Sequence, residues 1–203
     1  MKAGQVLNHC KIPALASVTP DEVVSGSAGK EMDVFTAIKK RRSIRRFKSN
    51  PLSDEIIFKL LDAARHAPTA GNVQPWKFFV VRDKDMQSKL AKAALGQTWM
   101  TTAPVIVVVC ADLVRSGASY GRRGAELYAL QDTAAATQNM ILCAVGEGIA
   151  CCWVGAFREK AAAEALGINL QVLRPVAMVP LGYPAESPAK AQKLSLEEIT
   201  DFI

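Results

Sequence analysis

The sequence predicts one sandwich of helices and strands, of either the α/β or the α+β class. Helical and strand patterns alternate along most of the chain, and the pattern at residues 104–110 is a continuous β-branched run, typical of a strand covered on both faces. With 203 residues, the chain is long enough for one full domain and too short for two ordinary ones.

Residues 1–30 are predicted to be an N-terminal extension or linker, because they lack sustained periodicity and end in the flexible composition of residues 25–29. The domain is predicted to span residues 31–203. Polar residues 8–11 interrupt the N-terminal stretch where a secretory signal needs an apolar core, and no apolar run approaches the roughly twenty residues that cross a bilayer. We therefore expect a cytoplasmic protein with no membrane partner.

The first elements follow from periodicity and capping. A helix is predicted over residues 32–42, where Phe35 and Ile38 lie on one face. A second helix is predicted to begin at the N-cap Ser53 and to stop before Pro68, with an apolar stripe at positions 56, 57, 60, 61 and 64. Residues 69–75 are predicted to form a loop that opens directly onto a strand over residues 76–81.

The second half of the chain continues the alternation. After the central strand at 104–110, residues 124–145 are mostly good helix formers with few polar interruptions, so we expect a long, largely buried helix that contributes to a subunit interface. A strand over residues 151–154, a short helix over 158–166 that Gly167 stops, and a strand over 175–181 complete the prediction.

The formal net charge of +6 attracts anionic ligands, and it would equally attract nucleic acid. Outside positions 39–48 the basic residues are dispersed, and no RNA-recognition, zinc-finger or long basic-helix pattern accompanies them. We therefore expect no nucleic-acid partner.

Familiar catalytic groups are missing. His9 and His66 are far apart and lack a Glu-x-x-His or Cys-x-x-Cys companion, so no metal site is expected. Most of the five cysteines are expected to be reduced core thiols; Cys151 and Cys152 are interpreted in this way, with a redox-active pair as the alternative. A chain without an evident acid, base or nucleophile is typical of an enzyme whose cofactor performs the chemistry.

Four arginines stand at positions 41, 42, 45 and 46, within the sequence Arg-Arg-Ser-Ile-Arg-Arg-Phe of residues 41–47. A dianionic phosphate needs several fixed guanidinium or amide donors, so this pattern predicts an anion pocket. The alternative is a solvated helix end, because cations at the end of the predicted helix would favour the negative end of its macrodipole.

Four segments together resemble the nitroreductase family of flavin enzymes, and they occur in that family's order and spacing. They are residues 41–47, the Asn-Val-Gln-Pro-Trp of 72–76, the Gly-Ile-Ala-Cys-Cys-Trp-Val-Gly-Ala-Phe of 148–157, and the Leu-Gly-Tyr-Pro of 181–184. The resemblance covers about residues 32–203. It implies an α+β nitroreductase-like fold, with a central mixed or antiparallel sheet flanked by helices, and an intertwined homodimer in which both subunits line each site.

The resemblance also implies the cofactor FMN, with NADH or NADPH as electron donor, and assigns the residues that bind the flavin. Its phosphate and ribityl chain fall to Arg41, Arg42 and Ser43, the pyrimidine end of its ring to Arg45, and its polar edge to Asn72 and Gln74. Backbone amides at Gly155 and Ala156 are expected near the reactive N5, and Lys193 stands where many relatives have an arginine. No residue is assigned as a catalytic acid, base or nucleophile; N5 carries the chemistry, and Arg45 and Gly155 assist.

The implied function is an FMN-dependent oxidoreductase that uses NAD(P)H to reduce a small acceptor, such as a nitroaromatic compound or a quinone, by ping-pong hydride transfer. The alternatives are a non-catalytic flavin carrier or redox sensor, and a flavin-fragmenting enzyme of the same family. Residues 119–123 are a candidate flap over the flavin, in which Arg122 or Arg123 meets an anionic group; solvated charges before a helix are the alternative.

Overall fold

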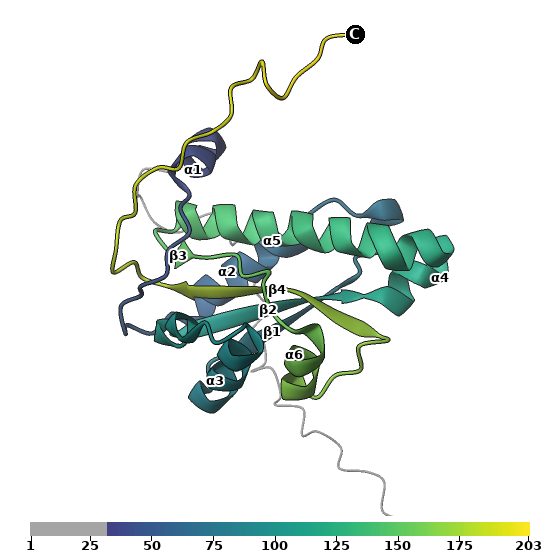
Figure 1. The fold of residues 1–203 in the computed structure, drawn as a ribbon, viewed down its shortest axis with the longest axis horizontal. Coiled ribbons are helices and arrows are strands. Elements are labelled where there is room, and N and C mark those ends of the chain that lie inside the picture. The colour runs from purple at the N-terminus through teal and green to yellow at the C-terminus, as the bar shows by residue number, and fades with distance from the viewer. Residues whose placement is uncertain (1–31) are drawn as a thin grey trace, which may run out of the picture. The chain divides into compact units, whose positions relative to one another are not determined.

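The computed structural model describes residues 32–203, so the predicted extension over residues 1–30 and its boundary lie outside the described residues. The described chain forms a four-stranded sheet between two layers of helices (Figure 1). The sheet order is β1-β2-β4-β3, from β1 (Trp76–Val81), β2 (Val105–Asp112), β4 (Leu173–Gly182) and β3 (Ala150–Cys151), and all neighbouring strands are antiparallel. Ser43 adds an isolated parallel bridge to Cys151. The antiparallel sheet with helices on both faces confirms the predicted α+β class.

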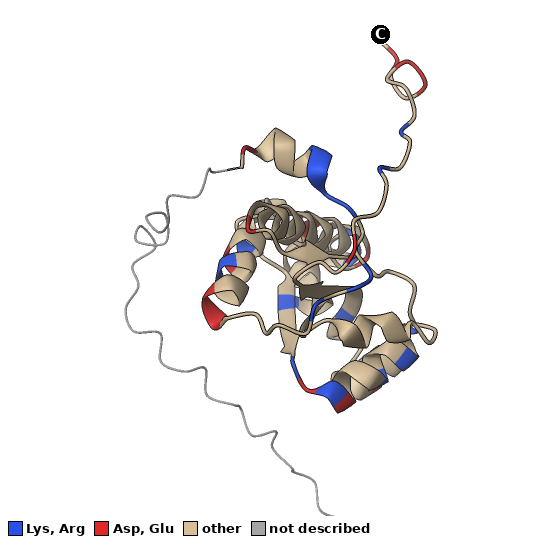
Figure 2. Cartoon of the chain, turned by 90° about the vertical axis from the view of Figure 1, so that its left-hand side faces the viewer, with Lys and Arg blue, Asp and Glu red and all other residues tan. Residues whose placement is uncertain are grey.

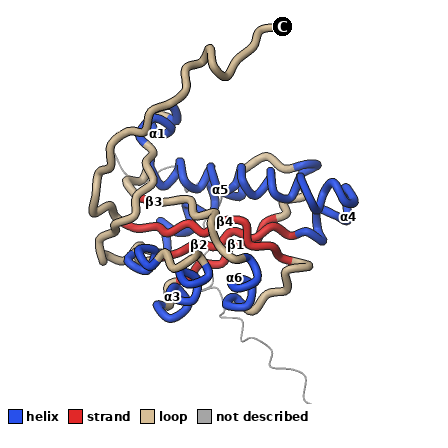
Figure 3. Tube along the Cα trace, viewed as in Figure 1, coloured by secondary structure: helices blue, strands red, loops and turns tan. Residues whose placement is uncertain are grey.

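The two faces of the sheet are covered by different helices. Helices α2 (Asp54–Arg65) and α5 (Ala129–Gly146) cover one face, and α3 (Lys84–Ala93) and α6 (Glu159–Leu166) cover the other (Figures 1 and 3). Strand β2 alternates between them: Val105, Val107 and Val109 pack with α2 and α5, whereas Ile106 and Val108 pack with α3 and α6. The prediction of a central strand covered on both faces is therefore confirmed.

Helix α2 has the predicted limits. The Ser53 hydroxyl accepts a hydrogen bond from the Ile56 N–H (3.4 Å), and the helix ends at Arg65, before Pro68. Leu60 and Ala64 are fully buried on the predicted apolar stripe. Capping and amphipathic burial therefore define this helix, as the sequence indicates.

Helix α1 (Val34–Lys40) is shorter than the predicted helix over residues 32–42. At Arg41 the backbone is already extended, with ψ 129°, and three residues later the Ile44 N–H donates to the Cys151 carbonyl (3.0 Å). Pairing with the sheet requires extended backbone, so it ends the helix before the arginines.

Two α-helices of the described chain were not predicted: α3, and α4 (Leu113–Arg123), which immediately follows β2. The candidate flap over residues 119–123 forms the end of α4 rather than a loop, and its role over the flavin stays a prediction. The helix is broken at Tyr120 and at Gly121, where φ is 57°. The two flap arginines are engaged locally, since Arg122 pairs with Glu126 (2.8 Å) and Arg123 donates to the Tyr128 hydroxyl (2.9 Å).

The predicted helix over residues 124–145 is divided in two. Residues Gly124–Tyr128 form a π-helical turn, and α5 begins at Ala129. The turn crosses α4 closely: the Ser116 hydroxyl donates to the Gly124 carbonyl (2.9 Å), and a Cβ at Gly124 would lie 2.2 Å from the Ser116 carbonyl oxygen. One side of α5 is buried, and its other side leaves Gln131 and Gln138 exposed, so burial on both sides is not seen within one chain.

The chain leaves the sheet early after β3. The predicted strand over residues 151–154 is interrupted after Cys151, where β3 ends, and Val154 forms only an isolated bridge with Met178. Beyond β4 the last residues form an arm that runs away from the sheet (Figures 1 and 3). Within residues 32–203, no helix is long and apolar enough to cross a membrane.

Candidate functional site

The arginine segment, residues 41–47, is anchored at one end of the sheet. Its backbone pairs with Cys151 through Ser43, and Phe47 forms an isolated bridge with Pro184. Ile44 and Phe47 are buried, each 8% exposed, and they pack in a small cluster with Ala103 and Ala150. Because the apolar residues of the segment face inward, its charged side chains project from a fixed backbone.

Glu186 holds the same segment from the C-terminal side. One oxygen of its carboxylate accepts the backbone N–H of Arg45 (2.5 Å) and that of Arg46 (3.2 Å). The guanidinium of Arg45 instead lies 5.8 Å from the centre of the Trp99 ring. The acid therefore fixes the backbone, and the side-chain charge of Arg45 stays available to a ligand.

A cavity of about 930 Å³ opens beside this segment, between the end of α1, one side of α5 and the C-terminal arm. Figure 2 shows the basic last turn of α1 continuing into the arginine segment, with further basic positions on the arm. The cations that line the cavity are Lys39, Arg41, Arg42, Arg45, Lys190 and Lys193, and no acidic residue lines it. Among residues 32–203, none of these six forms an ion pair with a carboxylate, so the cavity has a strong positive potential.

Arg42 is also engaged at the end of α1. Its Nη1 donates to the carbonyls of Lys39 and Arg41, at 2.8 Å each. These contacts match the alternative interpretation of the cluster, in which a cation stabilises the negative end of a helix. For Arg42 the two interpretations therefore hold together, because the residue both caps α1 and lines the cavity.

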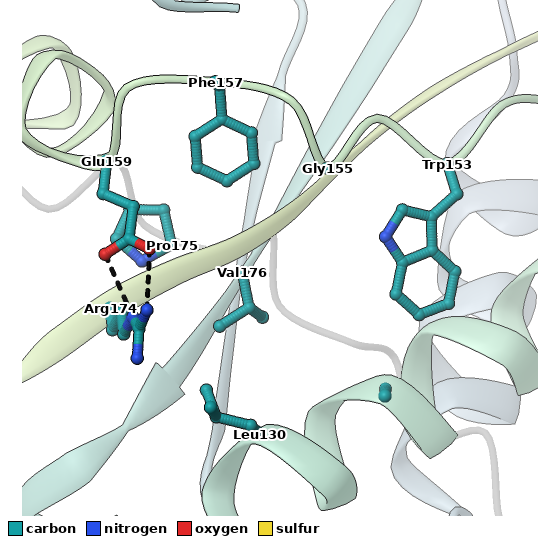
Figure 4. A pocket seen from close by; sticks show the side chains of 9 residues that line it. Leu130, Trp153, Gly155, Phe157, Glu159, Arg174, Pro175 and Val176 are labelled. Carbon is teal, nitrogen blue, oxygen red and sulfur yellow. Dashed lines mark hydrogen bonds and ion pairs between the residues drawn. The ribbon is translucent and has the colours of Figure 1, made fainter. Parts of the chain in front are cut away.

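Five of the nine predicted site residues line this cavity: Arg41, Arg42, Ser43, Arg45 and Lys193. Gly155 lines a second cavity of about 260 Å³, which is shown in Figure 4. Trp153 lines both cavities, so they adjoin. Trp153 is 40% exposed at this junction.

The second cavity is mostly apolar. Leu130, Phe157 and Val176 project into it in Figure 4. Its two charged residues neutralise each other, because Arg174 makes two hydrogen bonds to Glu159, at 2.8 and 3.0 Å. The hydrogen bond to Glu159 raises the pKa of Arg174, which therefore stays charged.

Gly155, which lines the second cavity, and its neighbour Ala156 leave two backbone N–H donors exposed. Within residues 32–203, neither N–H has a hydrogen-bond acceptor. A Cβ built on Gly155 would approach only the Trp153 Nε1, at 3.9 Å, which is an ordinary contact. The fold itself therefore does not require glycine at this position, and the open space in front of its backbone suits a ligand that approaches closely.

Asn72 and Gln74 lie elsewhere, in the loop of residues 69–75 that precedes β1. This loop adjoins the Trp76–Ala111 end of the sheet, whereas Ser43 and Cys151 adjoin the Val105–Leu181 end. The six residue steps of β2 from Val105 to Ala111 correspond to about 20 Å. One chain therefore does not bring this loop to the basic cavity.

The cysteine pair is divided between the two faces of the sheet. Cys151 packs with α2 and α5, and Cys152 packs with α3 and α6. Burial raises the pKa of the Cys151 thiol to about 12, and burial also raises that of Cys152. Both are free thiols, so the core interpretation is confirmed, although Cys151 also reaches the wall of the basic cavity.

Several cavity residues escaped the sequence analysis, notably Lys39, Gln138, Trp153 and Lys190. Gln138 is an exposed polar position on α5, but Gln131 on the same helix is exposed too, so the sequence does not single it out. Lys190 stands three residues before Lys193 in the arm, but a lysine pair in an irregular segment has no distinguishing pattern.

The sequence profile of the Nitroreductase family matches residues 38–99 and 93–183, which include the arginine segment, the 69–75 loop and Gly155. The chain belongs to this family. Nitroreductase-family membership confirms the resemblance carried by the four sequence segments.

Curated relatives of this nitroreductase-family chain extend the match over most of its length. The NADH dehydrogenase of Thermus thermophilus is 32% identical over 195 aligned positions, covering 83% of this chain and 95% of that protein. The FMN reductase (NAD(P)H) of Bacillus subtilis is 27% identical over 187 positions, covering 82% of this chain and 72% of that protein.

Solved structures of the nitroreductase fold superpose closely. The NfrA1 nitroreductase of Bacillus subtilis gives a TM-score of 0.75 at 26% identity and covers 83% of this chain and 73% of that one. A structure from Exiguobacterium sibiricum, in complex with FMN, gives 0.77 at 20% identity and covers 87% and 100%. At this identity the second structure shows the fold alone.

Proposed function

We propose that this chain is an FMN-dependent NAD(P)H oxidoreductase that reduces a small aromatic acceptor. The observation that carries the proposal is the basic cavity. It brings Lys193 together with Arg41, Arg42, Ser43 and Arg45 although about 150 residues separate them in sequence, and no acid lines it.

The phosphate end of FMN is assigned to Arg41, Arg42 and Ser43. Guanidinium groups bind phosphate oxygens through charge-assisted hydrogen bonds, and the fixed backbone at the Ser43–Cys151 bridge keeps them in place. Lys193 adds a point charge from the arm and gives less directional binding than an arginine would.

The ring end is assigned to Arg45 and to the exposed amides of Gly155 and Ala156. FMN, when bound, supplies hydride transfer through its N5. The Arg45 guanidinium, held at the rim of the cavity, stabilises negative charge that develops on the ring, and the two amides orient the N5 edge. The chain's own contribution is therefore orientation and charge stabilisation.

The acceptor is assigned to the apolar cavity beside Gly155. Its lining by Phe157, Trp153 and Val176 favours a flat apolar compound, and the mutual neutralisation of Arg174 and Glu159 favours an uncharged one. Nitroaromatic compounds and quinones fit this description. Either NADH or NADPH serves as donor, in a ping-pong cycle that uses the same space.

The loop with Asn72 and Gln74 is assigned to the polar edge of the flavin bound by a second copy. Gln74 Nε2 donates to Asn72 Oδ1 (3.2 Å), which leaves the Asn72 amide N–H groups and the Gln74 Oε1 for a ligand. A polar ring edge needs both a donor and an acceptor. In a homodimer, each loop would complete the site that the partner's arginine segment begins.

Exposed apolar side chains support an intertwined homodimer. On the C-terminal arm, Leu194, Leu196 and Phe202 are 67%, 72% and 97% exposed, and on α1 Val34 and Phe35 are 69% and 61% exposed. A monomer that leaves so much apolar surface in water is unfavourable. A second copy covers this surface and also brings the 69–75 loop within reach of the cavity.

The experiment that tests the function begins with the purified protein. Bound flavin is released by heat, identified by mass spectrometry, and the protein is then titrated without oxygen with NADH and with NADPH. We expect FMN, bleaching by at least one nucleotide, and reoxidation by a quinone or a nitroaromatic compound. The Arg45→Ala variant is expected to slow flavin reduction at least about tenfold while changing FMN affinity less, with Arg46→Ala as the matched control outside the cavity.

Three results would contradict the proposal in different ways. A protein that binds no FMN excludes the cofactor. Bound FMN that neither nucleotide reduces indicates a flavin carrier or sensor. Destruction of the flavin during turnover with oxygen indicates a flavin-fragmenting enzyme.

A further inference from the structure

Among the described residues, five polar or charged side chains are buried: Gln87, Ser116, Asp132, Thr133 and Thr137. Asp132 is the only ionisable one, and it is 7% exposed. It lies in the first turn of α5, but α5 continues directly from the π-helical turn, so Asp132 does not cap a free helix end. An isolated carboxylate in such a place costs free energy, so its presence needs another reason.

The hydrogen bond of Asp132 leaves its own helix. Both carboxylate oxygens accept from the Ala70 N–H, at 3.4 and 3.3 Å, across 62 residues of sequence. The neighbouring threonines behave differently, since Thr133 and Thr137 donate to carbonyls one turn back in the same helix, at 2.7 Å each. Asp132 therefore ties α5 to the first residue of the turn that contains Asn72.

The tethered turn has an unusual backbone. Gly71, Asn72 and Gln74 have φ of 53°, 56° and 54°, in the left-handed region that residues other than glycine rarely adopt. Such backbone persists only where its surroundings hold it, and it gathers at functional sites. Ala70, whose N–H donates to Asp132, immediately precedes the first of these residues.

Two contacts from α4 hold the same turn from the other side. Arg115 Nη1 donates to the Gln74 carbonyl (3.3 Å). The Tyr120 hydroxyl lies so close to Gly71 that a Cβ there would be 2.2 Å from its oxygen. The turn is thus fixed at its start by Asp132, in its middle by Tyr120 and at its end by Arg115.

We propose that Asp132 is a positioning residue of the flavin site, which sets the left-handed turn of residues 70–74 so that Asn72 and Gln74 present their amides to the flavin. It acts through the Ala70 N–H and does not itself touch the cofactor. This inference rests on the proposed function, because the flavin gives the turn its ligand. Burial raises the pKa of Asp132, and the hydrogen bond from the Ala70 N–H partly opposes that rise.

The test compares Asp132→Ala with Thr137→Val, which removes a buried hydrogen bond from the same helix without touching the turn. Hydrogen exchange of the full chain is measured over residues 69–75, and FMN affinity is measured by flavin fluorescence. Asp132→Ala is expected to speed exchange in this segment and to weaken FMN binding about tenfold, because the half-buried Ala70 N–H loses its acceptor. Thr137→Val is expected to leave both unchanged even where it lowers the melting temperature, and Asp132→Asn, which keeps an oxygen acceptor, is expected to restore most of both.

A double-mutant cycle with Asn72→Ala identifies the route of the effect. If Asp132 acts through the turn, Asp132→Ala weakens FMN binding much less in the Asn72→Ala background than in the wild type. Two results overturn the role of Asp132 alone. In the first, Asp132→Ala and Asn72→Ala weaken FMN binding by factors that multiply fully in the double variant. In the second, Asp132→Ala changes hydrogen exchange and FMN affinity no more than Thr137→Val does. A wild-type protein that binds no FMN overturns the proposed function itself, so the two failures are distinguished.

Discussion

The two ends of the sheet bind by different means. At the end nearest α1, the arginine segment has ordinary backbone, inward apolar anchors and six cations around an open cavity. At the end nearest α4, the 69–75 loop has no charged residue, three left-handed residues and a network of hydrogen bonds (Figure 1). The first end recognises a ligand by charge and the second by geometry. Substitutions should therefore act on affinity through charge at one end and through backbone order at the other.

The largest effect is expected where charge is removed. Arg41→Ala combined with Arg42→Ala should weaken FMN binding at least about 100-fold, because each guanidinium makes charge-assisted hydrogen bonds to phosphate. Fluorescence titration at several salt concentrations measures it, and the salt dependence of binding should fall with the affinity. Arg46→Ala, which removes a charge that does not line the cavity, is the control. An equal loss in the control would show that only the overall charge matters.

The second effect tests whether one flavin site takes its arginine segment from one chain and its 69–75 loop from the other. When the Arg41→Ala/Arg42→Ala chain is mixed with an Asn72→Ala chain and the subunits are exchanged, each heterodimer should contain one intact site and one doubly defective site. The expected result is recovery of tight FMN binding in about half of the heterodimer sites, since the two ends lie about 20 Å apart in one chain. Tagged heterodimers isolated by affinity chromatography are titrated with FMN. No recovery would mean that both ends serve the same site from one chain.

The sequence predicts these two ends unequally. Helix α2 and strands β1 and β2 follow from the Ser53 cap and from β-branched runs, since local chemistry determines them. The end of α1 was placed too late, because the long-range pairing of Ile44 with Cys151 overrides helix propensity there. Helix α3 had a usable signal in Asp83, whose side chain accepts from the Met86 N–H (2.8 Å).

The site shows the same division. Arg41 and Lys193 were both expected at the phosphate, and the structure brings them to one cavity. The motif that names Asn72 and Gln74 cannot say that they lie at the far end of the sheet, because a motif gives residue types and order but not distance. Asp132 was invisible for another reason: an acid within a helical pattern is normally solvated, and only the three-dimensional contact with Ala70 distinguishes it.

The third effect measures how strongly geometry is enforced at the loop end. Gly71→Ala should lower the free energy of unfolding by about 3 kcal/mol, because the new Cβ adds left-handed strain and meets the Tyr120 hydroxyl. Gly96→Ala is the matched control: Gly96 also has positive φ, at 79°, but a Cβ there has nothing within 4 Å, so strain alone should cost about 1–2 kcal/mol. Urea denaturation measures both. Adding Tyr120→Phe should recover part of the free energy of unfolding that Gly71→Ala loses. Equal losses at the two glycines would mean that the Tyr120 hydroxyl does not contribute to the loss.

The smallest effect is a pH dependence confined to the loop end. The folded pKa of Asp132 is raised above its ordinary value of 3.8 by burial, so its contribution to stability is fully present below that value and is lost as pH rises through the folded pKa. Asp132→Asn removes this titration, so its stability relative to wild type should improve as pH rises from 4 to 7. Denaturation of both proteins across this range measures the difference, in which the titration of other groups cancels. The stability of Arg41→Ala and of Thr137→Val should each differ from that of wild type by an amount that does not change with pH, because neither arginine nor threonine titrates in this range. A constant difference for Asp132→Asn as well would mean that the pKa of Asp132 does not change on folding. Both ends of the sheet would then be insensitive to acid.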